Sequence, residues 1–118
     1  MQQKNIDSGA QAEQFAAKFL QKQGLILLHH NYRSRHGEID LIMRDGDVVV
    51  FVEVRLRSRK DFGGAAASID AIKQKKLLHT AQLYLSGLPH LPPCRFDAVL
   101  FHSGKEGDIE WIKNAFAG

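Results

Sequence analysis

Residues 37–57 read GEIDLIMRDGDVVVFVEVRLR, and this stretch decides the fold. Two β-type runs flank Asp45-Gly46, and an Asp-Gly pair between alternating apolar positions is a strong signal for a β-hairpin. With these two residues at the centre of the turn, the facing apolar pairs are Ile39 with Val52, Leu41 with Val50, and Met43 with Val48. We therefore expect one wholly apolar face that packs on a core.

The other face of the predicted hairpin is rich in charge. Glu38 would lie across from Glu53, with Asp40 diagonal to Glu53 at a Cα separation of about 7–8 Å. Like charges opposite each other destabilise a sheet, and Mg²⁺ would compensate them because it takes carboxylate oxygens together with water and phosphate. Arg55 points to the same side because strand side chains alternate. The alternative is a solvated polar face in which Glu38, Glu53 and Arg55 merely pair.

Length and composition indicate an ordinary soluble protein. The 118 residues, 44% of them hydrophobic and 25% charged, suffice for one domain with a single core. No apolar run approaches the length of a membrane span, and the N-terminal MQQKNIDSG contains no apolar signal-peptide core. We therefore expect a cytoplasmic protein without a membrane partner. The net charge of +3 permits nucleic acid as a partner without requiring it.

The remaining chain predicts an α/β domain with a mixed central sheet. A helix is expected to begin at Asp7 and Ser8, with Ser8 as its cap, and to end at about Gln23. A short strand at 25–28, a polar connection at 29–36 and the hairpin follow. After the hairpin we expect a helix that is capped by Ser68 and ends near Leu85, and then strands at 95–101 and 109–112. Ile72 is among the inward candidates of the second helix. The pattern is helix, three strands, helix, two strands. Helices on the apolar face would leave the acidic face partly open.

Basic residues begin where the carboxylates end. Arg55, Arg57 and Arg59 share one side of an extended segment, and Lys60 follows. Guanidinium groups match phosphate geometry, so the row predicts a track that leads a polyanion to the metal site. A charged edge strand that blocks aggregation is the alternative. Arg33, in the polar connection, is a further candidate for backbone contact, although such connections are commonly just solvated.

Glu13 lies at the edge of the apolar stripe of the first helix, beside Ala16, Ala17 and Leu20. A carboxylate at this position usually marks the start of the solvated face. It could instead point along the sheet toward Asp40 and Glu53. Spacing alone does not decide between these two orientations.

These motifs resemble the restriction-endonuclease-like nuclease superfamily, whose signature is an acidic residue followed by a D/E-x-K triplet. GEID would supply the first element and FVEVR the second. More narrowly, the chain is similar to the bacterial YraN family in Gly9 and Glu13, Asn31-Tyr32-Arg33, GEIDLI, FVEVRLRS, Lys73-Gln74-Lys75 and CRFDAVLF. The resemblance implies a single restriction-endonuclease-like domain over residues 1–118. It also implies that Asp40 and Glu53 hold a catalytic Mg²⁺ or Mn²⁺, with Glu13 as a helix-borne acidic partner similar to that of Holliday-junction resolvases.

One departure concerns Arg55, which occupies the position of the superfamily lysine. Lysine can lose a proton when its pKa is lowered, whereas arginine effectively cannot. Arg55 could still stabilise negative charge on phosphorus or hold the attacking water. Metal and nucleic-acid binding are therefore safer to infer than turnover.

The sequence thus predicts a metal-dependent endonuclease that acts on DNA, including branched or recombination and repair intermediates. The expected catalytic residues are Asp40, Glu53, Arg55 and Glu13, and the expected nucleic-acid-binding residues are Arg33, Arg57, Arg59, Lys60 and Lys73. Two alternatives stay open: a non-catalytic nucleic-acid-binding module with a nuclease-like fold, and a protein–protein interaction domain with an incidental acidic face. A homodimer is also left open.

Overall fold

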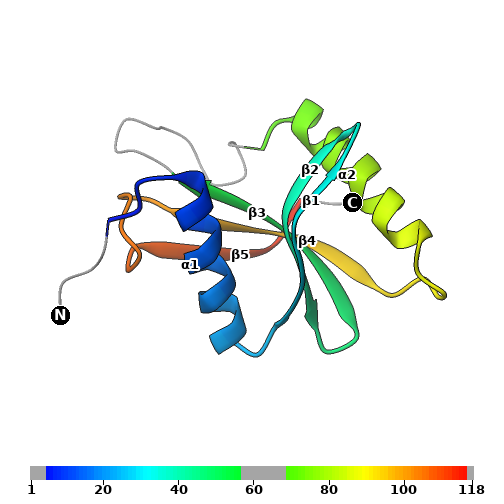
Figure 1. Cartoon of the computed structure of the whole chain (residues 1–118), viewed down its shortest axis with the longest axis horizontal. Coiled ribbons are helices and arrows are strands. Elements are labelled where there is room, and N and C mark those ends of the chain that lie inside the picture. Colours follow the sequence, from blue (N-terminus) through cyan, green and yellow to red (C-terminus); the bar gives the residue numbers. More distant parts are fainter. Residues whose placement is uncertain (1–4, 57–68, 117–118) are drawn as a thin grey trace.

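The computed structural model describes residues 5–56 and 69–116. The elements are α1 (Gly9–Lys22), β1 (Ile26–Ser34), β2 (Gly37–Asp45), β3 (Val48–Leu56), α2 (Ala71–Ser86), β4 (Cys94–Phe101) and β5 (Ile109–Phe116) (Figure 1). Neighbouring strands follow chain order from β1 to β5, and β3 and β4 are parallel while the other pairs are antiparallel. The predicted α/β pattern with a mixed sheet is confirmed.

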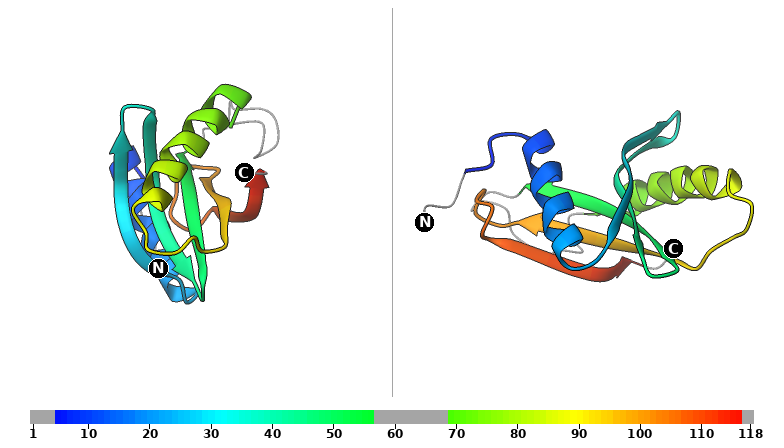
Figure 2. Two further views of the ribbon diagram at one scale, coloured as in Figure 1. Left: turned by 90° about the vertical axis from the view of Figure 1, so that its right-hand side faces the viewer. Right: turned by 60° about the horizontal axis from the view of Figure 1, so that its bottom comes forward.

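The two helices cover opposite faces of the sheet (Figures 1 and 2). On the α1 side, Leu20 packs with Leu41 and Val50, and on the α2 side, Leu77 packs with Phe51. Because both faces are covered, five consecutive residues of β2, 39–43, are buried. The expectation of a single apolar face with an open acidic side is therefore wrong. The continuous apolar character of the central strands was the signal for burial on both sides.

The predicted hairpin exists, but its register differs by two residues from the expected one. Leu41 pairs with Val52, and the ladder begins with Asp45 opposite Val48, so the central turn residues are Gly46 and Asp47. Gly46 has φ of +60°, and a turn with glycine at its first central position matches the twist of the flanking strands. This even shift keeps Leu41 and Met43 on one face as predicted, but Ile39 packs in the other core, on the α2 side, which corrects its prediction on the same face.

Both helix starts carry side-chain caps. Ser8 Oγ accepts the N–H of Gln11 at 3.2 Å, which confirms the predicted start of α1. In α2 the cap is Asp70, whose Oδ1 accepts the N–H of Lys73 at 2.8 Å. The expected cap, Ser68, lies outside the described residues. Ile72 is 70% exposed and does not face the core, which corrects its prediction as an inward residue.

Two strands are longer than their apolar residues indicate. β1 continues through the polar residues 29–34 because these pair with β2, and β5 continues past Ile112 to Phe116. The ring of Phe116 stacks on that of Phe96 with centroids 4.7 Å apart. Residues 29–34 of the predicted connection are therefore strand, and both strands extend beyond their hydrophobic runs through backbone pairing. Among the described residues, no helix has the length and apolar character needed to cross a membrane.

Candidate metal and nucleic-acid site

Asp40 lies where β2 and β3 stop pairing with each other. The ladder between these strands extends from Asp45 opposite Val48 to Leu41 opposite Val52. One position further, Oδ2 of Asp40 accepts the backbone N–H of Val54 at 2.8 Å. A carboxylate oxygen therefore replaces the backbone carbonyl that would continue the ladder. This bond orients the Asp40 side chain, which belongs to a residue that is only 8% exposed.

Glu53 lies on β3 beside Asp40 and is 5% exposed. Two cations approach its Oε1 atom: Lys73 Nζ at 3.2 Å and Arg55 Nε at 3.5 Å. A side-chain hydrogen bond joins Glu53 to Asp40. We call these two acidic residues the carboxylate pair. The structure thus brings together Asp40, Glu53 and Arg55, three of the four predicted catalytic residues, and adds Lys73 from α2.

Burial makes ionisation of the carboxylate pair unfavourable. It raises the pKa of Glu53 to about 7, and the nearby Asp40 adds to this effect, whereas Lys73 and Arg55 oppose it. Burial also raises the pKa of Asp40, against the hydrogen bond from Val54. A hydrogen bond between two carboxyl groups requires a proton on one of them. The pair therefore binds a proton more tightly than ordinary carboxylates, and a cation that binds to it competes with that proton.

Glu13 is electrostatically connected to the same site through Asp40. Partial burial, then the charges of Asp40 and Glu38, raise the pKa of Glu13 to about 7, and a hydrogen bond with Asn31 and the charge of Arg33 oppose the rise. The side chain belongs to the lining of a cavity of about 260 Å³ between α1 and β1. These contacts favour the predicted orientation toward Asp40 over a solvated one.

Asn31 is a contact of Glu13 that the sequence did not predict. It has φ of 53°, a left-handed conformation that asparagine adopts more readily than most residues. The available signal was the asparagine itself, a residue type that tolerates the left-handed conformation.

Glu38 does not join the carboxylate pair, so the predicted cluster of Glu38, Asp40 and Glu53 is wrong. The observed register places Glu38 opposite Arg33 of β1, and Arg33 Nε lies 3.2 Å from Glu38 Oε2. Both side chains are exposed. Arg33 therefore already has an acidic neighbour, which makes it a weaker candidate for binding phosphate.

The remaining predicted nucleic-acid residues separate into two groups. Arg57, Arg59 and Lys60 lie outside the described residues. Lys73 lies in the first turn of α2 and contacts Glu53 directly, a contact that the sequence did not predict. The available signal was a lysine at a helix N-terminus, where the helix dipole disfavours positive charge unless an acidic partner is near.

The donor atoms of the carboxylate pair fit a hard divalent cation. Within residues 5–56 and 69–116, no group of three or more His, Cys, Asp or Glu side chains is placed to hold a metal ion. Two carboxylates are nevertheless the usual protein contribution to a Mg²⁺ site, in which waters and substrate phosphate complete the shell. Asp40 and Glu53 would thus suit Mg²⁺ or Mn²⁺ in chemistry and number, with water and substrate phosphate as further ligands.

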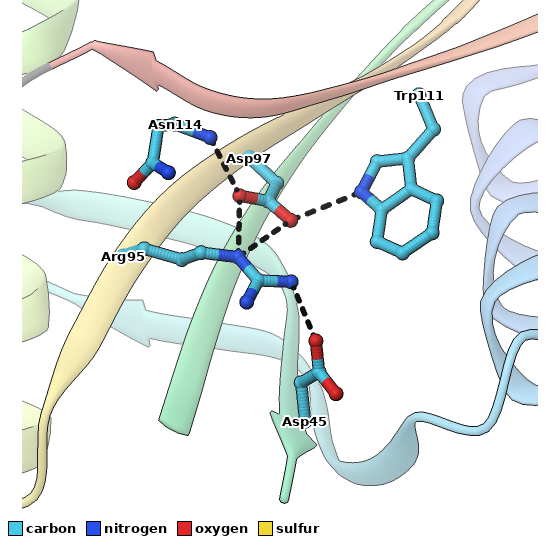
Figure 3. Close-up of polar contacts among 5 residues, drawn as sticks. All are labelled: Asp45, Arg95, Asp97, Trp111 and Asn114. Carbon is cyan, nitrogen blue, oxygen red and sulfur yellow. Dashed lines mark hydrogen bonds and ion pairs between the residues drawn. The ribbon is translucent and has the colours of Figure 1, made fainter.

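A third buried acidic residue among those described, Asp97 of β4, has a structural role that the sequence did not predict (Figure 3). Its two oxygens accept bonds from Arg95 Nε at 3.1 and 3.2 Å, from Trp111 Nε1 at 3.0 Å and from the Asn114 N–H at 3.0 Å. Arg95 also donates to Asp45 Oδ2 at 3.0 Å. We call these five residues the Asp97 cluster. It connects β4, β5 and the β2–β3 turn, and the bonds to both oxygens explain how the carboxylate is buried.

These features define a class of protein: a mixed α/β fold with a buried carboxylate pair at the divergence of two central strands, flanked by a lysine and an arginine. Within this class the chain belongs to a specific family. Residues 12–101 match the family model described as "Uncharacterised protein family UPF0102", the family also called YraN. The resemblance found in the motifs is confirmed.

Relatives from several bacteria share most of the length of the chain. A UPF0102 protein of Nitrosomonas europaea is 62% identical over 110 residues, which cover 93% of each chain. A relative in Nitrosospira multiformis is 57% identical over 92% of this chain and 91% of its own. One from a Janthinobacterium species is 52% identical over 92% of this chain and 85% of its own. Their names state the family and no activity.

Proposed function

We propose that this protein is a Mg²⁺- or Mn²⁺-dependent endonuclease that hydrolyses phosphodiester bonds in DNA, including branched or recombination and repair intermediates. The observation that carries the proposal is the buried carboxylate pair with Lys73 and Arg55 beside it. The motif resemblance to restriction-endonuclease-like nucleases, which would make the chain one such domain, supports the same reading.

In this proposal Asp40 and Glu53 hold the metal ion. A bound Mg²⁺ or Mn²⁺ would lower the pKa of a water molecule and polarise a phosphoryl oxygen. The hydrogen bond from Val54 keeps Asp40 oriented, and Arg55 helps to orient Glu53 from the same strand. Burial of the pair excludes water and strengthens its attraction for a divalent charge.

Arg55 would stabilise negative charge, and Glu13 would transfer protons. Arg55 keeps its positive charge at all relevant pH values and would stabilise the negative charge that develops on phosphorus. Glu13, with a pKa of about 7, can either hold or release a proton at neutral pH, which suits general acid–base work next to Asp40. Arg33, Arg57, Arg59, Lys60 and Lys73 are the proposed contacts to the DNA backbone.

The test uses Asp40→Asn and Glu53→Gln, which keep side-chain shape but remove a negative charge. We expect the wild-type protein to cut single-stranded, duplex or branched DNA in Mg²⁺ or Mn²⁺ and to be inactive in chelator. Each variant should lose activity by a factor on the order of 10² or more, with unchanged circular dichroism. Glu110→Gln, the same change at an exposed carboxylate of β5, should cleave like wild type. Full cleavage by both Asp40→Asn and Glu53→Gln would reject the assignment.

A non-catalytic nucleic-acid-binding module is the second candidate. It is favoured by Arg55 at the lysine position and by the lack of a third metal-donor side chain among the described residues. This candidate predicts salt-sensitive DNA binding, because phosphate contacts release counterions, without strand scission in any divalent ion. Gel shifts at two salt concentrations, run beside the cleavage assay, separate the two. Failure to bind DNA even at low salt would oppose both.

A further inference from the structure

Lys73 and Arg55 approach the same oxygen of Glu53 but are tethered differently. Arg55 belongs to β3 itself, two residues from Glu53, so the strand holds its guanidinium on the same side. Lys73 reaches Oε1 from α2, and its side chain is 37% exposed. An ammonium on a flexible four-carbon stem is the more mobile of the two cations.

The position of Lys73 in α2 is unfavourable for a helix. Asp70 is the N-cap, so Lys73 is the third helical residue, and the first turn contains no acidic side chain. Positive charge in this turn is repelled by the helix dipole. Glu53 is the group that offsets this repulsion in the structure, at 3.2 Å. If the charge of Glu53 were neutralised by another cation, both the dipole and that cation would drive Lys73 away from the pair.

With both carboxyl groups ionised, the charges around the pair are matched. Two carboxyl groups face two cations, and a divalent ion at the pair would add charge that must be offset elsewhere. A phosphate group of the substrate brings that negative charge, and the partly exposed, flexible side chain of Lys73 can follow it.

We propose that Lys73 is an exchangeable cation: it holds Glu53 in the metal-free protein and moves to the substrate phosphate when the carboxylate pair binds a divalent ion. This inference rests on the proposed function and adds a coupling between metal binding and phosphate contact. Lys73 therefore competes with the metal in the free protein and cooperates with it once DNA is present.

The first experiment measures binding of Mn²⁺ alone, by the electron paramagnetic resonance signal of the free ion, to wild type, Lys73→Met and Lys75→Met. Lys75 is an exposed lysine two residues further along α2 and provides the same charge change without the Glu53 contact. We expect Lys73→Met to bind Mn²⁺ at least about fivefold more tightly than wild type, because a competing charge is gone. Lys75→Met should differ from wild type by less than about twofold, as expected for an exposed charge.

The second experiment measures DNA affinity with Ca²⁺, which we use to occupy the pair without supporting cleavage, and again in chelator. In chelator Lys73 stays on Glu53, so Lys73→Met should bind DNA within about twofold of wild type. In Ca²⁺ the variant should bind at least about fivefold more weakly, because the released ammonium is missing. A purely structural role of Lys73 would weaken Mn²⁺ and DNA binding together, and circular dichroism verifies the fold.

Two outcomes would overturn the inference. One is that Lys73→Met binds Mn²⁺ no more tightly than wild type. The other is an equal loss of DNA affinity in Ca²⁺ and in chelator. Neither readout requires cleavage, so a wild-type protein that cuts no DNA would reject the proposed endonuclease while both binding measurements still decide the role of Lys73.

Discussion

Asp40 and Glu53 each have one oxygen committed to a partner within the protein. Oδ2 of Asp40 accepts from Val54, and Oε1 of Glu53 contacts Lys73 and Arg55. These contacts orient the two carboxylates, which also interact with each other. Two buried acids with raised pKa values are unfavourable for folding alone, and such strain is commonly found at functional sites.

The raised pKa of Glu53 makes stability depend on pH in a defined direction. The pKa is about 7 in the folded protein against 4.5 for an ordinary glutamate, so the folded state binds more protons between these values. Stability should therefore fall as pH rises from about 4.5 to about 7, and Asp40 contributes in the same direction. For Glu53→Gln we expect this fall to shrink by roughly 1–3 kcal/mol, measured by urea unfolding at pH 5 and pH 7.5 without metal.

Asp47→Asn is the control for this measurement, because it removes an exposed carboxylate from the β2–β3 turn and should retain the wild-type pH dependence. Addition of Mn²⁺ should recover stability mainly at pH 7.5, where the pair gives up its proton most easily. An identical pH dependence in Glu53→Gln and wild type would contradict the assignment of the raised pKa.

At the scale of elements, the site depends on where β2 leaves β3. Two sets of contacts hold β2 where it leaves β3. One is the hydrogen bond from the Val54 N–H to Asp40, and the other joins the β1–β2 turn to α2. In this turn Ser34 Oγ lies 3.1 Å from Thr80 Oγ1, which is fully buried. Gly37 has φ of +145°, and a Cβ there would lie 3.5 Å from that of Lys76. The turn and α2 are thus held close, which places the first turn of α2 over Glu53.

The Asp97 cluster should dominate the stability of the β4–β5 end of the sheet. In Asp97→Asn the new amide would direct N–H groups at the Arg95, Trp111 or Asn114 donors and leave Arg95 with less compensating charge. We expect a loss of about 2–4 kcal/mol in the free energy of unfolding, measured in urea. Asp45→Asn, at a half-exposed partner of the same arginine, should cost less than about 1 kcal/mol.

The two substitutions therefore compare a fully buried and a half-exposed partner of one arginine. Mn²⁺ binding should persist in both variants, because neither residue belongs to the carboxylate pair. Equal losses of stability in Asp97→Asn and Asp45→Asn would show that burial of Asp97 is not what makes the cluster important.

For the whole molecule, two apolar cores share one sheet. Leu20 belongs to the α1 core and Leu77 to the α2 core, and β2 and β3 contribute side chains to both. Because both cores pack on this sheet, disruption of one core also removes support from the other. A chain of this size with a shared sheet is expected to unfold in one cooperative step.

Leu20→Ala and Leu77→Ala test this coupling. Each removes a buried side chain and should cost about 2–5 kcal/mol, with the larger loss at Leu20, which is completely buried. Both variants should show a single transition in which circular dichroism and Trp111 fluorescence coincide. Separate transitions by the two probes would mean that the two cores unfold independently and would contradict the expectation of one domain.

Much of this protein could be predicted from local patterns. The order of helices and strands, the central hairpin, the cap at Ser8, and Asp40, Glu53 and Arg55 as the residues of one site were all predicted, because periodicity, turn residues and motifs depend on near neighbours in the chain. The hairpin register was wrong by two residues because either pairing places Leu41 and Met43 on the same face. The turn conformation at Gly46 decided it.

The amino-acid sequence by itself determined the order of the helices and strands, the central hairpin, and which side chains of the candidate site are acidic or basic. Tertiary structure alone decided that Glu38 faces Arg33, that Lys73 reaches Glu53 from α2, and that Asp97 joins Arg95 and Trp111. The physical reason is that Lys73 and Glu53, like Asp97 and Trp111, belong to segments far apart in the chain, whereas Glu38 faces Arg33 only in the register that β1 and β2 adopt. Their distances depend on how the helices pack against both faces of the sheet, and no local pattern encodes that packing.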